Sequence, residues 1–243
     1  MSDEFIGFTD DFMFCSVMED EEKCKELLQR ILNIEITEIK TVCKQKTIKN
    51  RKISRGVRLD IYARDVDGNK YDIDMQTTKE SYLGKRTRYY HSEMDGESIR
   101  KGVKYKNLKR SIVIFICTYD CFGDNRSIYT FKSICDENKG IYLDDERETI
   151  ILNALGNREN VDEKLGTFLD YVKTGIAEDE FTHNLEETVK TFNENEEWRN
   201  KFVTLEMKFD QKYEQGHEDG MEAGRIEGRE LLLVTLVKVK YTP

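Results

Sequence analysis

The chain of 243 residues carries 39 Lys and Arg against 48 Asp and Glu, which gives a formal net charge of −9. With 38% hydrophobic and 36% charged residues, it has the composition of a globular protein, long enough for one domain with appendages. The acidic balance excludes a chain built as a polycation, so any binding of nucleic acid must depend on local basic patches.

Neither the apolar segments nor the cysteines suggest a membrane protein or a secreted protein. The first four residues include Asp3 and Glu4 and no apolar run follows them, and the strongest apolar run, residues 112–117, is too short to cross a bilayer. The six cysteines are scattered without a CxxC pair, which is typical of free thiols. We therefore expect a cytoplasmic protein with no membrane partner.

The first third of the chain predicts a helix followed by a basic strand. In residues 19–32, Cys24, Leu27, Leu28 and Ile31 recur at helical spacing. Residues 36–48 alternate well enough for a first strand. Residues 40–58 hold eight basic side chains and no acidic one, and such a run is either a solvated loop or a contact for a phosphate backbone.

Residues 57–76 predict a β-hairpin, because apolar and polar residues alternate along both arms around Asp67-Gly68. A two-residue loop would oppose Leu59 to Gln76 and mix apolar with polar residues on both faces. A three-residue loop opposes Leu59 to Met75 and keeps each face uniform. We therefore predict the longer loop, with Gly68 in the left-handed region.

This register places Asp60 opposite Asp74 on one face of the hairpin. Directly opposed residues have Cβ atoms about 4.5–5.5 Å apart, so two carboxylates would repel unless a cation neutralised them. Mg²⁺ suits the pair, since it takes hard oxygen ligands and often only one or two protein carboxylates. The alternative is a solvated face on which Arg58 and Arg64 balance the two acids.

The middle of the chain predicts an α/β order. Residues 77–108 are expected to be mostly helical, and residues 111–119 have the continuous apolar pattern of a central strand. Residues 127–134 and 148–152 are expected to add edge strands. Basic and Tyr side chains are interleaved along the predicted helix, which suits nucleic acid, although tyrosines can equally pack on the sheet. The candidate DNA contacts are Arg58, Arg86, Arg88, Lys101, Lys104 and Tyr105.

The last part of the chain changes character. Residues 161–172 and 185–209 show helical spacing with many acids, and glycines then recur at every fourth position from Gly216 to Gly228. Such glycines weaken a helix, by about 1 kcal/mol each relative to Ala, unless a partner helix packs closely on them. Self-association into a homo-oligomer and a fraying tail both remain open.

The ordered motifs resemble one known family. They read LDIYARDVDGNKYDIDMQ, then KRTRYYHSEM, then KGVKYKNL. Together they are similar to the Rpn-like recombination-promoting nuclease and transposase family of the PD-(D/E)XK nuclease superfamily, over about residues 8–156. The resemblance implies an α/β fold with an αβββαβ core and a mixed sheet. It predicts a nuclease-like domain at 1–157, a helical appendage at 158–210 and a Gly-spaced helical tail at 211–243.

The resemblance also implies a metal-dependent DNA endonuclease associated with recombination or mobile elements. Asp60 and Asp74 would hold Mg²⁺, or Mn²⁺ or Ca²⁺ in its place, and Gln76 would orient the attacking water. Asp11 matches an acidic position of the family and is a candidate third ligand; Glu26 is the other. Asp74 departs from the usual Glu, so the site could be slow or degenerate.

Two other functions stay open: a catalytically degenerate DNA-binding protein, and a self-associating helical interaction protein.

Overall fold

The computed structural model describes residues 5–48, 57–98 and 104–241. The chain divides into two compact units, Met1–Phe192 and Asn193–Pro243. The boundaries at residues 157 and 210 that the sequence suggests remain a prediction.

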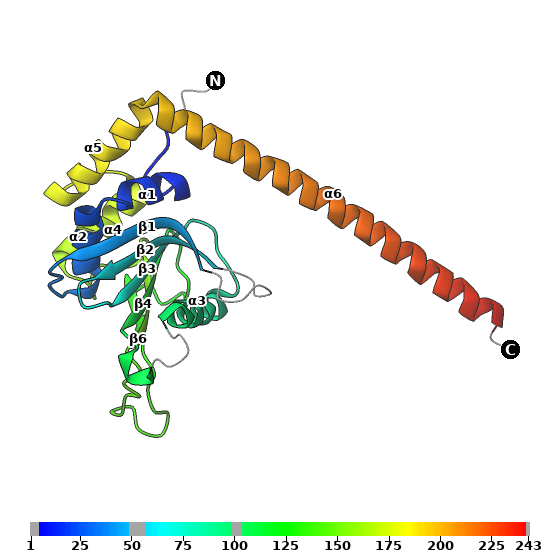
Figure 1. Cartoon of the computed structure of the whole chain (residues 1–243), viewed down its shortest axis with the longest axis horizontal. Helices are drawn as coiled ribbons and strands as arrows, with labels where there is room; N and C mark the ends of the chain where they lie inside the picture. Colours follow the sequence, from blue (N-terminus) through cyan, green and yellow to red (C-terminus); the bar gives the residue numbers. More distant parts are fainter. Residues whose placement is uncertain (1–4, 49–56, 99–103, 242–243) are drawn as a thin grey trace. The chain divides into compact units, whose positions relative to one another are not determined.

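The first unit is an α/β fold around one six-stranded mixed sheet, as expected from the sequence (Figure 1). Its strands lie in the order β1-β2-β3-β4-β6-β5. The antiparallel hairpins β1-β2 and β2-β3 are followed by the parallel pairs β3-β4 and β4-β6, and β5 runs antiparallel to β6. The strands are β1 (Ile39–Ile48), β2 (Val57–Asp65), β3 (Lys70–Gln76), β4 (Ser111–Cys117), β5 (Ile128–Phe131) and β6 (Arg147–Asn153).

Helices cover both faces of this sheet (Figure 1). Helices α1 and α2 contact β1, and α3, which connects β3 to β4, packs on β4. The αβββαβ core order is therefore confirmed, and it explains why all of β4 is buried. The helices of this unit are α1 (Asp11–Met18), α2 (Glu21–Leu32), α3 (Leu83–Ser98), α4 (Glu163–Thr174) and α5 (Glu180–Glu194).

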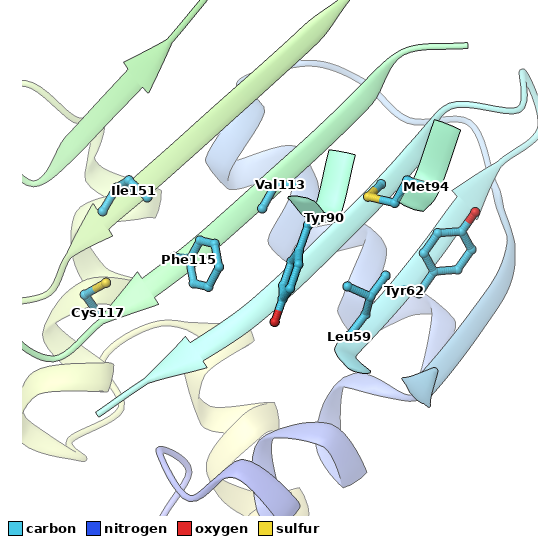
Figure 2. Close-up of a cluster of buried hydrophobic side chains, with 8 residues drawn as sticks. All are labelled: Leu59, Tyr62, Tyr90, Met94, Val113, Phe115, Cys117 and Ile151. Carbon is cyan, nitrogen blue, oxygen red and sulfur yellow. The ribbon is translucent and has the colours of Figure 1, made fainter. Parts of the chain in front are cut away.

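The face under α3 holds a buried cluster (Figure 2). Tyr90 and Met94 of α3 pack against Val113 and Phe115 of β4, and the rings of Tyr90 and Phe115 stack with centroids 6.0 Å apart. Leu59, Tyr62, Cys117 and Ile151 complete the cluster. This packing places α3 over β2 and β4, the strands on either side of β3, where the candidate site lies.

Three expected elements differ in the structure. The strand at residues 148–152 was expected at an edge, but β6 lies inside the sheet between β4 and β5, because Ile150, Ile151 and Leu152 are apolar enough to be covered on both faces. Helix α3 is much shorter than residues 77–108. The helix expected at 185–209 is two helices, since Asn195 separates α5 from α6 and caps α6 through the amide of Trp198.

The second unit consists mainly of α6 (Glu196–Tyr241), a helix of 46 residues. Trp198 and Phe202 stack near its start with ring centroids 5.8 Å apart. Within the residues that the structure describes, no helix is both long and apolar enough to cross a membrane.

Candidate active site

The β2-β3 hairpin has the register that its alternation predicts. Ile61 pairs with Ile73 and Tyr62 with Asp72, as the three-residue loop requires. The amide of Gly68 donates to the carbonyl oxygen of Asp65 at 3.1 Å, and Gly68 has φ 87°, in the left-handed region. The polar residues of β3 therefore share the face of the sheet that α3 covers.

The pairing of β2 with β3 ends at Ile61 and Ile73, and Asp60 contacts Asp74 just beyond it. The amide of Asp60 donates to Oδ1 of Asp74 at 3.1 Å. Asp74 is completely buried, whereas Asp60 is half-buried. From the opposite side, Sγ of Cys15 in α1 lies 3.5 Å from the carbonyl oxygen of Asp60 and donates to it. The backbone of β2 is thus held at this point by both a helix and a carboxylate.

Arg86 of α3 reaches into this site and contacts two of the predicted catalytic residues. One terminal nitrogen donates to Oδ2 of Asp74 at 2.9 Å, and the other donates to Oε1 of Gln76, also at 2.9 Å. Its Nε donates to the hydroxyl of Tyr90 at 2.7 Å. Glu80 pairs with the same guanidinium at 3.2 Å from the exposed side. We expected Arg86 at a DNA phosphate, but its side chain is turned toward the carboxylates and is only 26% exposed.

Burial shapes the electrostatics of the site. It raises the pKa of the Asp74 carboxyl to about 6, against the opposing effects of the Arg86 charge and the Asp60 amide. Burial, followed by the negative charges of Asp74 and Asp60, raises the pKa of the Asp72 carboxyl well above its usual range. These two carboxyl groups therefore hold their protons more readily than exposed ones do, and the charge of Arg86 opposes this effect.

Asp72 was not among the residues predicted for the site. It is completely buried on β3, and a side-chain hydrogen bond with Asp74 contributes to the pKa shifts of both carboxyl groups. The signal that could have found it is the period of two, because residues 72, 74 and 76 share one face of a strand. A solvated polar face was the competing interpretation of that pattern, and the burial of Asp72 and Asp74 excludes it for this strand.

The donor set fits a hard divalent cation. The half-buried Asp60 and the buried Asp74 offer carboxylate oxygens, which are the ligands that Mg²⁺, Mn²⁺ and Ca²⁺ take in proteins. No group of three or more His, Cys, Asp or Glu side chains is placed to hold a metal ion in the described part of the chain. The fit is therefore to an ion with one or two protein carboxylates, which is usual for Mg²⁺.

Asp11, the predicted third ligand, is exposed in the first turn of α1. The cap of this helix is Asp10, which accepts hydrogen bonds from the amides of Phe12 and Met13. Glu26 lies on α2 and accepts a hydrogen bond at 2.9 Å from Nε of Arg30, which is on the same helix. A ligand role for Asp11 remains a prediction.

The predicted DNA contacts lie in different settings. Arg88 is exposed and lines a cavity of about 670 Å³ together with Lys132 and Arg147. Lys104 is exposed and directly precedes the short 3₁₀ helix η1 (Tyr105–Asn107). Tyr105, the first residue of η1, is 82% exposed. Arg58 lies in β2 opposite Thr47, and Lys101 lies outside the described residues.

Part of the basic run at residues 40–58 is neutralised within the fold. Lys44 pairs with Glu19 at 2.6 Å, and Lys46 pairs with Glu97 at 2.7 Å. The ammonium of Lys46 also lies 3.6 Å from the centroid of the Tyr62 ring. These two lysines therefore stabilise β1 against its neighbours, and they are weaker candidates for phosphate binding than the exposed residues of the region around η1.

Comparison with known proteins identifies the family. No curated protein and no solved structure matches the chain. Residues 8–215 match the family described as PD-(D/E)XK nuclease family transposase. This match covers the hairpin with Asp60 and Asp74, the helix with Arg86 and the helices that follow the sheet. The chain belongs to the PD-(D/E)XK nuclease family transposases.

Proposed function

We propose that the chain is a metal-dependent DNA endonuclease that hydrolyses phosphodiester bonds and serves recombination or mobile elements. The observation that carries this proposal is the hydrogen-bonded approach of Asp60 to the buried Asp74 beside Gln76, within a family of nucleases. Asp60 and Asp74 would hold Mg²⁺, with Mn²⁺ or Ca²⁺ as alternatives. The bound ion would supply Lewis-acid polarisation of a phosphoryl oxygen and an activated water.

The side chains of this site divide the remaining work. Gln76 can hydrogen-bond the water but carries no charge with which to stabilise a phosphorane-like transition state. Arg86 carries that charge and already contacts Oε1 of Gln76. The rings of Tyr90 and Phe115 pack against the guanidinium of Arg86, with their centroids 5.2 and 5.1 Å from its Cζ. Arg86 thus stands where it can fix the orientation of Gln76 and contribute positive charge.

DNA would approach over exposed basic and aromatic residues near the site. Arg88, Lys104 and Tyr105 are exposed, and phosphate contacts by Arg and Lys together with stacking by Tyr are the usual means of binding a backbone and unpaired bases. Because Lys and Arg contacts to phosphates release counterions from DNA, this binding should weaken steeply with salt.

A catalytically degenerate DNA-binding protein is the second candidate, and one contact favours it. Both oxygens of Asp74 are engaged, one by the amide of Asp60 and one by Arg86. A cation would have to compete with the arginine for this carboxylate. Asp74 is also shorter by one methylene than the Glu that the family resemblance leads one to expect, and misplacement by about 1 Å can cost roughly 10²-fold in rate.

The experiment is nicking of supercoiled plasmid by the full chain with Mg²⁺, Mn²⁺ or Ca²⁺. We compare the native protein with Asp60→Ala and with Asp67→Ala, which removes an exposed carboxylate from the turn of the same hairpin. The proposed function predicts metal-dependent nicking that falls at least about 10²-fold in Asp60→Ala and stays unchanged in Asp67→Ala.

The other functions predict different results. Salt-sensitive DNA binding without nicking by any of the three proteins would establish the degenerate DNA-binding protein. Neither nicking nor DNA binding at low salt would leave the interaction protein. Equal nicking by the native chain and Asp60→Ala would exclude Asp60 from the reaction and point to a contaminating nuclease.

A further inference from the structure

The cavity that Arg88 lines has no ligand in the proposed function. Its volume is about 670 Å³, and it lies between the first half of α3 and the segment that connects β5 to β6. Ligand pockets usually have about 300–1,000 Å³, so this one has room for a nucleotide. Two kinds of side chain, basic ones and exposed apolar ones, gather on its walls.

The charged side chains of this cavity are all positive. Arg88, Lys132 and Arg147 line it, and among the described residues no Asp or Glu does. Outside the cavity, Lys132 pairs with Glu148 at 3.0 Å and Arg147 with Asp145 at 3.7 Å. Arg88 is exposed and forms no ion pair with any described residue. In a chain of net charge −9, a cavity with this charge indicates an anionic ligand.

Exposed apolar side chains stand beside these cations. Phe131 and Tyr142 supply aromatic rings and are 48% and 52% exposed. The cavity is also lined by three exposed aliphatic residues, Ile134, Ile141 and Leu143. Ile134 and Tyr142 pair in antiparallel fashion, so the segment between β5 and β6 forms an arm whose backbone is held by its own contacts. Such a group of exposed apolar side chains usually marks a contact for a ligand or a partner.

Helix α3 connects this cavity with the candidate active site. Gly84, Thr87 and His91 line the cavity, whereas Arg86, held by Tyr90, contacts the catalytic carboxylate. Each residue advances an α-helix by about 100°, so the two sets occupy neighbouring stripes of the same helix. A strand of DNA that reaches the carboxylates therefore passes close to the cavity.

We propose that this cavity binds an unpaired nucleotide of a single-stranded DNA segment. The inference rests on the proposed function and names the form of DNA that the site takes. The cations contact phosphates, and the rings of Phe131 and Tyr142 stack on the base. A duplex keeps the faces of its bases stacked on one another, so it would leave the apolar side chains of the cavity without a partner. An acidic protein segment is the other occupant with suitable chemistry, and the neighbouring nuclease site favours DNA.

The test measures binding of oligonucleotides without metal and without turnover. A labelled single strand of about 16 nucleotides and a labelled duplex of the same length are titrated with the full chain in the presence of a chelator. Fluorescence anisotropy gives Kd at several salt concentrations. The native chain is compared with Tyr142→Ala and Arg88→Gln. Both side chains are exposed, so the variants should fold, and equal melting temperatures check this.

The two variants should change different quantities. Tyr142→Ala should weaken binding of the single strand by at least about fivefold and leave the duplex nearly unchanged, because it removes a stacking ring. Tyr213→Ala, which removes an exposed tyrosine of α6, should change neither. Arg88→Gln should lower the slope of log Kd against log salt concentration by about 0.7 for the single strand, as expected for one phosphate contact. Lys173→Gln, at an exposed position of α4, should leave this slope unchanged.

The remaining outcomes separate this inference from the proposed function. Unchanged single-strand binding in both variants, or equal weakening of single strand and duplex in Tyr142→Ala, would overturn the inference even if the chain nicks plasmid. Altered sedimentation of Tyr142→Ala with unchanged DNA binding would make the arm a protein contact and would also overturn it. The predicted losses in a chain that nicks no plasmid would support the cavity, whereas the endonuclease activity would fail.

Discussion

His91 shows how a single buried side chain can make the stability of this fold depend on pH. It is 2% exposed, with Nδ1 at 2.8 Å from Oγ of Ser111 and Nε2 at 3.0 Å from Oγ1 of Thr149. Burial lowers the pKa of His91 to about 4, the charge of Arg147 lowers it further and that of Asp145 opposes the shift. The imidazole is therefore neutral in the folded chain near neutral pH.

The sign of the effect follows from the two states. The pKa in the folded chain is about 4 and in the unfolded chain about 6.5, so the unfolded chain binds more protons between these values. The contribution of His91 to the free energy of unfolding is therefore complete above the unfolded pKa of about 6.5, and it is lost as the pH falls toward 4. We expect the native chain to lose about 2 kcal/mol more than His91→Gln between about pH 7.5 and about pH 5.

Urea unfolding at a series of pH values measures this difference. His183→Gln is the matched control, because His183 is exposed on α5. It should lose stability with falling pH in parallel with the native chain. If His91→Gln also runs parallel to the native chain, then His91 does not link folding to protonation.

Residue types alone could not predict the contacts of Arg86 or the burial of Asp72. The sequence led to Asp60, Asp74 and Gln76 because strand alternation and hairpin register follow from local pattern. It gave no means of telling which basic side chain of the following helix turns inward, since this depends on how α3 is rotated when its Tyr90 packs on Phe115 of β4. Burial of Asp72 likewise depends on α3 covering the strand, which is a tertiary effect.

At the scale of elements, sequence patterns predicted those helices and strands correctly whose structure depends on residues close together in the chain. The β2-β3 hairpin was predictable because loop length, Gly68 and alternation all agree. The place of β6 was not, because strand order across the sheet depends on contacts between distant segments. The short helix α1 was also missed, since its eight residues lack a clear amphipathic period and six of them are buried.

Arg30 connects elements that lie far apart in the sequence. Its Nη1 donates to the carbonyl oxygen of Lys164 in α4 at 3.0 Å and to Oδ2 of Asp179 before α5 at 2.6 Å. The guanidinium lies 4.4 Å from the ring centroid of Phe181. Because the side chain of Arg30 is buried, this group of contacts should hold α2 against the two later helices of the same unit.

We therefore expect Arg30→Met to lower the free energy of unfolding by about 2 kcal/mol, since it removes the buried guanidinium that hydrogen-bonds Asp179 and the carbonyl oxygen of Lys164. Lys190→Met is the matched control, because it breaks an exposed ion pair with Glu186 within α5. The control should cost less than about 0.5 kcal/mol. Urea denaturation compares the two, and equal losses would show that Arg30 is no more than a surface contact.

For the whole molecule, the two compact units carry different chemistry. The carboxylates, Arg86 and the exposed basic residues all belong to Met1–Phe192, whereas α6 begins with Glu196 and Glu197 and presents many charged side chains. Residues 210–227 of α6 are exposed throughout, so this part of the helix lacks the packed apolar face from which most helices in proteins gain their stability. Gly216, Gly220 and Gly224 weaken it further, by about 1 kcal/mol each relative to Ala.

The glycines of α6 make sense if a second copy packs closely on them, so we predict that the full chain forms a homo-oligomer through α6. Gly220→Leu should shift it toward the monomer in sedimentation velocity, because a leucine keeps the helix backbones apart. Glu222→Leu adds the same side chain about 200° away around the helix and should leave association unchanged. A native chain that stays monomeric at tens of micromolar would instead make the repeat a fraying tail, and then neither substitution should alter sedimentation.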